Sequence, residues 1–179
     1  WRWFTAQLAP LAAWQENRSF YLPPGSAALS PYANPYNSGI DLPLRMGPSS
    51  FWTFDWGQSY LRAEAWNLAA GFSNENLWWG PGLRNALLMT NTGPGFPHLF
   101  LGTARPLDVH VGWLEAELGW GRLRPSRYFD GDTGNRRLFE WAVFTFAPTF
   151  QRDLTLGVAR VWINKTTRVS ARDYLNPLV

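Results

Sequence analysis

The chain has 179 residues, enough for one domain with its own core, and its 46% hydrophobic share does not suggest disorder. The net charge is +3, from 16 Lys+Arg against 13 Asp+Glu, and the arginines are spread along the chain, which argues against a nucleic-acid partner. No cysteine is present, which excludes disulfides, thiolate zinc sites and a cysteine nucleophile.

The unusual feature is the aromatic share of 17%, which includes 12 tryptophans. Tryptophan gathers at membrane interfaces, sugar-binding faces and protein interfaces, where one end of the ring is apolar and the other is wet. No run approaches the ~20 apolar residues of a spanning helix, so any membrane crossing is expected to use strands. The chain opens in a strand-like pattern, without a signal peptide, and closes on no recognisable ending. We therefore expect 1–179 to be an internal fragment of one β-barrel domain.

In chain order, stretches of about ten residues with period-two character recur, each closed by Gly, Pro, Asn or Asp, which is the weak signature of membrane strands. The region 59–70 is the best helical candidate, but it also fits a strand. Pro10 inside the first stretch indicates an edge or a bulge. The expected strands are Trp1–Trp14, Phe51–Gly57, His98–Arg105, Gly112–Leu123, Leu138–Phe146 and Leu154–Asn164.

The clearest alternation lies in Gly112–Leu123. The even-numbered residues of this stretch are apolar and end in a tryptophan, whereas the odd-numbered ones include acids and glycines. In a strand these two sets face opposite sides. One side fits lipid and an aromatic girdle, the other a polar, crowded lumen, although a soluble sandwich or lectin barrel gives the same pattern. The two sets are Leu114, Ala116, Leu118 and Trp120, and Glu115, Glu117, Gly119 and Gly121.

Two stretches rich in turn formers predict loops. The region 15–50 carries proline, tyrosine and asparagine clusters, and a loop of that length is common on the outer surface of membrane barrels. Pro125–Arg137 is expected to be a hairpin loop.

The densest candidate binding motif runs from Asn74 to Asn85. Paired tryptophans can stack on sugar rings, and neighbouring Asn, Glu and Arg can bind hydroxyls and acidic groups; a girdle tryptophan pair beside a turn is the alternative. The turn is assigned to Gly80, Pro81 and Gly82. The proposed polysaccharide-binding residues are Glu75, Trp78, Trp79, Arg84, Asn85 and Asn91.

No catalytic set is expected. Glu115 and Glu117 share a strand face at a spacing that glycosidases can use, but we interpret them as two lumen-facing acids matched by arginines across the barrel. His98 and His110 have no neighbours that indicate a metal site, and a structural role is expected for each. Asp130 and Asp132 lack the other oxygen ligands of a calcium loop. We expect no enzyme activity, no metal and no cofactor.

Several short motifs in a fixed order resemble the capsule-assembly Wzi family. They are Asp41–Gly47, Glu75, Trp78–Gly82, Asn85–Asn91, Gly95–Pro97, Thr103–Pro106, Gly112, Gly121–Leu123, Ser126–Phe129, and Leu154–Gly157 with Arg160 and Trp162. The resemblance covers most of the chain, which is well under half of a usual member.

The resemblance implies an antiparallel transmembrane β-barrel of the bacterial outer membrane, with roughly eighteen strands in the whole protein. It also implies a non-enzymatic, lectin-like role in which the barrel, in contact with outer-membrane lipid, holds capsular or exopolysaccharide at the surface of a Gram-negative cell. The arginine content favours an acidic polymer. The alternatives are an outer-membrane porin or polysaccharide export channel, and a soluble carbohydrate-active enzyme.

Overall fold

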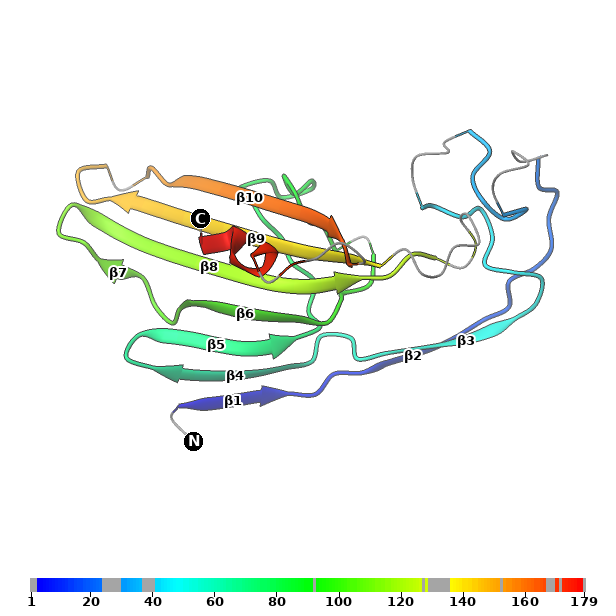
Figure 1. Cartoon of the computed structure of the whole chain (residues 1–179), viewed down its shortest axis with the longest axis horizontal. Helices are drawn as coiled ribbons and strands as arrows, with labels where there is room; N and C mark the ends of the chain where they lie inside the picture. The colour runs from blue at the N-terminus through cyan, green and yellow to red at the C-terminus, as the bar shows by residue number, and fades with distance from the viewer. Residues whose placement is uncertain are drawn as a thin grey trace.

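The computed structural model describes residues 3–23, 30–36, 41–91, 93–126, 128, 136–151, 153–166, 170 and 172–178. Within them the chain is almost entirely strand and irregular connection (Figure 1). The elements are β1 (Phe4–Gln7), β2 (Leu11–Gln15), β3 (Phe51–Asp55), β4 (Tyr60–Ala65), β5 (Leu68–Ser73), β6 (His98–Thr103), β7 (Leu107–Asp108), β8 (Gly112–Leu123), β9 (Arg137–Pro148), β10 (Leu156–Lys165) and the 3₁₀ helix η2 (Asp173–Leu178).

The main sheet runs in the order β1-β4-β5-β6-β8-β9-β10, with β7 beside β8, and every strand pair in it is antiparallel. β2 and β3 form a separate antiparallel hairpin that extends beyond the sheet (Figure 1). The prediction of an all-β antiparallel fold is confirmed. The described sheet is open, since β1 and β10 are its two outer strands.

The strands begin and end close to where the sequence places them, with two differences. The first expected strand is interrupted around Pro10, so that it becomes the edge strand β1 and the hairpin strand β2. The region 59–70 is a β-hairpin and contains no helix. Trp66 and Asn67 form its two-residue turn with φ of 47° and 64°, the backbone that such turns require.

The connections of the main sheet differ between its two ends. One end carries the Trp66–Asn67 turn and the short links around β7 and between β9 and β10. The other end carries the connections 74–97 and 124–136, together with the β2–β3 hairpin and its irregular extension. Most of the expected loop 125–137 lies outside the described residues, whereas the described parts of 16–50 contain no strand or helix.

One face of the main sheet, which we call the apolar face, is formed by aliphatic and aromatic side chains from all seven strands of the main path. Strand register places these residues on the same side, and many remain exposed, for example Leu99 at 56% and Val158 at 67%. Its exposed members are Phe4, Leu61, Leu68, Phe72, Leu99, Leu101, Phe144, Leu156 and Val158. The alternation predicted for β8 is observed, because Leu114, Ala116, Leu118 and Trp120 lie on this face.

The apolar face also carries charged side chains: Arg122 and Arg160 are exposed, whereas Glu140 is buried. The Arg160 guanidinium lies 4.7 Å from the ring centre of Trp162. Glu140 is fully buried beneath η2, where Nδ2 of Asn176 donates a 2.9 Å hydrogen bond to its Oε2. Nε1 of Trp120 also donates to the Tyr174 carbonyl of η2 at 2.9 Å, so this short helix caps one end of the face.

The opposite face, which we call the loop-covered face, carries the core. Trp141 is fully buried there and packs with Trp79 and Phe139. Partly buried side chains complete the cluster: Leu77, Met89, Phe96, Leu123, Val143 and Val161. The connection 74–97 supplies half of these residues and lies across this side of the sheet (Figure 1). Among the described residues, no helix is long and apolar enough to span a membrane.

Two glycines of β8 permit this packing. A Cβ on Gly119 would lie 1.9 Å from Cζ2 of Trp141, and one on Gly121 would lie 2.3 Å from Cε2 of Phe96. The large rings therefore lie directly against the backbone of β8, as expected of glycines on a crowded face.

Candidate functional site

The connection 74–97 is fixed to the sheet at its start by hydrogen bonds. Asn74 is buried, and its Nδ2 donates at 3.0 Å both to Oδ1 of Asp55 and to the carbonyl of Gly57. Ser73 Oγ donates to Oε2 of Glu75 at 3.0 Å and accepts from the Glu75 backbone N–H at 2.9 Å. The predicted binding residue Glu75 is therefore held against the end of β5.

The predicted tryptophan pair divides into one buried and one exposed ring. Trp79 is only 8% exposed, and its ring centre lies 5.6 Å from that of Trp141. Trp78 is 36% exposed, and its Nε1 donates to the Gly82 carbonyl at 2.9 Å. Trp79 thus packs in the core, while part of the Trp78 ring stays at the surface.

Gly80 and Pro81, assigned to a turn from the sequence, lie at a bend of the connection. Gly80 has a φ of +103°, which favours glycine, and a Cβ on Gly82 would lie 2.1 Å from the carbonyl oxygen of Asn85. Arg84, Asn85 and Asn91 are exposed. Within the described residues, no hydrogen bond, ion pair or ring contact joins any two of the six predicted binding side chains.

The other residues considered from sequence have structural contacts. Oε1 of Glu117 accepts from Nε1 of Trp141 at 3.0 Å, whereas Glu115 is exposed. His98 is buried, with Nδ1 2.8 Å from the Phe96 carbonyl and its ring centre 5.2 Å from that of Trp141. His110 lies in an exposed turn, and Asp130 and Asp132 lie outside the described residues. No cluster of metal-binding side chains occurs in the described part of the chain.

A second polar region lies on the loop-covered face near β1. Nε of Arg62 and Oε1 of Glu64 are 2.8 Å apart, and the Arg62 guanidinium lies 6.0 Å from the ring centre of Phe100. A pocket of about 410 Å³ is lined by Thr5, Tyr60, Arg62, Glu64, Glu75 and Phe100. Glu75 thus also lines a pocket beyond its own connection.

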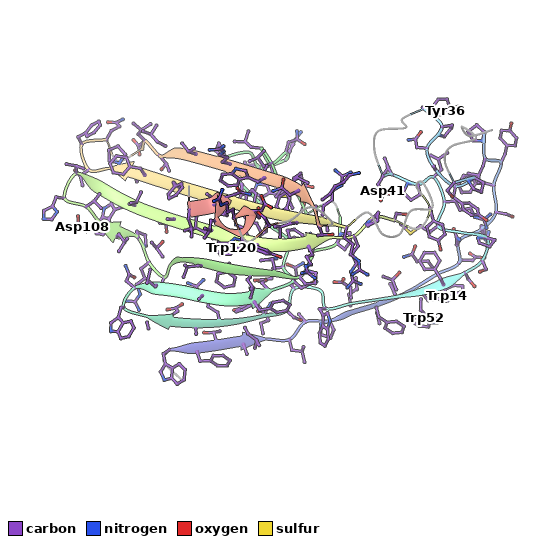
Figure 2. All side chains as sticks on the ribbon, in the orientation of Figure 1. Trp14, Tyr36, Asp41, Trp52, Asp108 and Trp120 are labelled. Atoms are coloured by element: carbon purple, nitrogen blue, oxygen red, sulfur yellow. The ribbon has the colours of Figure 1, made fainter. Side chains whose placement is uncertain are left out.

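A groove of about 1120 Å³ lies at the end of the main sheet that carries the long connections. Phe54 and Trp56 of the hairpin line it, as do Arg122 and Arg124 at the end of β8. Arg136, Trp120 and Tyr174 line it as well, with residues 88–90 and 93–97 of the long connection on another side. Figure 2 shows Trp14 and Trp52 on the hairpin and Trp120 in the main sheet beside η2.

Reasoning from sequence did not identify the residues of this groove as a site. The sequence did contain a pattern that could have indicated this groove. Aromatic residues occupy the alternate positions 52, 54 and 56, and arginines occupy positions 122 and 124. Alternate positions share a strand face, so both sets were candidates for one surface. Comparison with protein-family models, with curated proteins and with solved structures found no match for this chain.

Proposed function

We propose that this chain forms part of the wall of an outer-membrane β-barrel of the capsule-assembly Wzi type. In this proposal the barrel holds capsular or exopolysaccharide at the bacterial cell surface and catalyses no reaction. The observation that carries the proposal is the exposed apolar face of the main sheet, because a surface of that size and composition needs an apolar environment.

Strand length and aromatic placement support lipid as that environment. β8 and β9 each have 12 residues and β10 has 10, against the about 9–11 that a tilted strand needs to cross a bilayer, whereas β4, β5 and β6 have 6 each and β1 has 4. Trp66 lies at one end of the sheet, and Trp120 and Trp162 lie on the apolar face toward the other. Tryptophans at both interfaces are typical of outer-membrane barrels.

The asymmetry of the connections supports an orientation. Outer-membrane barrels have short periplasmic turns and longer extracellular loops. The Trp66–Asn67 turn would then face the periplasm, and the connection 74–97 would lie at the cell surface. In that orientation Trp78, Arg84 and Asn91 would meet polysaccharide.

The test is to delete the gene in its host and measure cell-bound and released polysaccharide in pellet and supernatant. A shift from pellet to supernatant at constant total polymer is expected if the protein anchors polymer. An unchanged ratio would contradict the proposal, and a lower total would indicate a role in synthesis or export.

A second candidate, a solute channel, is favoured by one observation. Arg62, Glu64 and Glu117 all lie on the loop-covered face, which would line the lumen of a barrel. Charged rings in a lumen set ion selectivity. Conductance of the full-length protein in planar bilayers, with selectivity altered by Glu64→Gln, would favour the channel over the anchor.

A further inference from the structure

The β2–β3 hairpin carries an exposed row of aromatic rings, which we call the aromatic strip: Trp14, Trp52, Phe54 and Trp56. Trp14 and Trp52 are register partners, so their side chains leave the same face of the hairpin, and Phe54 follows two positions along β3. The four residues are 55%, 60%, 76% and 65% exposed. No described side chain therefore covers the strip.

The rings of Trp52 and Phe54 stack on each other at the surface of the hairpin. Their centres are 5.8 Å apart and their planes differ by 14°, so the two rings stack nearly parallel. Flat, exposed rings offer apolar faces to the apolar C–H faces of sugar rings, and they lose little conformational entropy on binding because aromatic side chains have only two χ angles.

The aromatic strip continues into the groove of about 1120 Å³, since Phe54 and Trp56 belong to both. Across the groove, three arginines present exposed side chains: Arg122, Arg124 and Arg136. Within the described residues, none of the three forms an ion pair. The acid that lines the same groove, Asp55, is already bound, because its Oδ1 accepts from the Gly57 N–H and from Nδ2 of Asn74.

This combination of groups favours one kind of occupant. Arginine guanidinium groups bind carboxylates through two parallel hydrogen bonds. Apolar rings beside these three arginines therefore fit a polymer that has both sugar faces and carboxylates.

We infer that the aromatic strip and the arginine-lined groove form one binding track for an acidic polysaccharide. Sugar rings stack on Trp52, Phe54 and Trp56, and uronate carboxylates pair with the three arginines. The track is separate from the Trp78–Trp79 motif and rests on the proposed function for its biological role. Several weak contacts along one polymer then add up to firm retention.

The test uses the full-length protein purified in detergent, with alginate as the uronate polymer and dextran as the neutral one. Two variants remove the two halves of the track: Arg122→Gln/Arg124→Gln/Arg136→Gln and Trp52→Ala/Phe54→Ala. Matched controls come from the opposite end of the sheet, Arg105→Gln and Trp66→Ala, both at exposed positions. Binding is measured by titration calorimetry.

The wild type should bind alginate at least about tenfold more tightly than dextran, and each track variant should lose about tenfold or more in alginate affinity while both controls keep theirs. Wild-type affinity for alginate in the track variants, or no alginate binding by the wild type, would overturn the inference. So would a Trp52→Ala/Phe54→Ala variant that changes only the oligomeric size, since the strip would then contact a second copy of the chain.

Failure of the inference and failure of the proposed function give different results. If gene deletion releases polymer from cells but the track variants bind alginate normally, the track is wrong and the anchoring function stands. If the variants lose alginate binding but deletion leaves the cell-bound polymer unchanged, the binding track stands and the anchoring function fails.

Discussion

Nε1 of Trp141 donates a 3.0 Å hydrogen bond to Oε1 of Glu117 across the β8–β9 pair, and this bond links the core of the loop-covered face to its polar region. Trp141 is fully buried, so its N–H has little access to water. Trp141→Phe removes the donor, leaves the Glu117 oxygen without that partner, and should lower the free energy of unfolding by about 1–3 kcal/mol.

The measurement for this variant is urea unfolding followed by near-ultraviolet circular dichroism. Trp66→Phe is the matched control, because Trp66 is 96% exposed and its change should stay within about 0.5 kcal/mol. Glu117→Gln keeps an acceptor oxygen and should cost less than Trp141→Phe. Equal losses for Trp141→Phe and Trp66→Phe would contradict a structural role for the bond.

Gly119 should not tolerate a methyl group. The Cβ of Gly119→Ala would lie 1.9 Å from Trp141, and overpacking of this kind costs about 1–3 kcal/mol. Gly157→Ala is the control, because the nearest heavy atom to its Cβ would be 3.9 Å away. Urea midpoints of the two variants compare them directly, and a similar loss in both would show that packing against Trp141 is not the cause.

The sequence predicted the strands well because their pattern is local. In β8 the alternation of leucine and alanine with acids and glycines follows from the period of a strand, and the observed faces match it. The interruption at Pro10 could also be predicted from the local sequence, because proline cannot donate a backbone hydrogen bond to a neighbouring strand. For region 59–70, the Trp66–Asn67 turn decides between helix and strand, and its positive φ values are a weak signal in the sequence.

The candidate site was less predictable because it depends on contacts distant in sequence. The burial of Trp79 is set by Trp141, which lies in a different strand, so adjacent tryptophans with the same local pattern differ in exposure. Alternation placed Trp52 and Phe54 on one face of a strand. It did not indicate that this hairpin leaves the main sheet and faces the arginines at the end of β8.

The contact between η2 and the sheet should depend on Asn176. Asn176→Ala removes the 2.9 Å hydrogen bond to Oε2 of Glu140, a fully buried carboxyl whose Oε1 has no hydrogen-bond partner among the described residues. Leaving a buried group unpaired costs about 1–3 kcal/mol, so η2 should detach more readily. Limited proteolysis near residue 170 should be faster in Asn176→Ala, whereas Leu178→Ala, at a 59% exposed position, should behave as wild type. The same cleavage rate in the wild type, Asn176→Ala and Leu178→Ala would contradict a role of this hydrogen bond in holding η2 to the sheet.

Replacements on opposite faces of one strand test the membrane proposal. Val158 and Ile163 both lie in β10 and are 67% and 51% exposed, but Val158 belongs to the apolar face and Ile163 to the loop-covered face. Arginine facing lipid costs roughly 2–4 kcal/mol at the bilayer midplane and about 0–1 kcal/mol near the interfaces, whereas arginine facing a lumen is tolerated. Val158→Arg should therefore reduce the amount of protein assembled in the outer-membrane fraction, measured by fractionation and by trypsin protection in whole cells, and Ile163→Arg should not. If the two variants assemble to the same extent, the apolar face does not contact lipid. An arginine side chain in contact with hydrocarbon would lower the stability of the assembled protein.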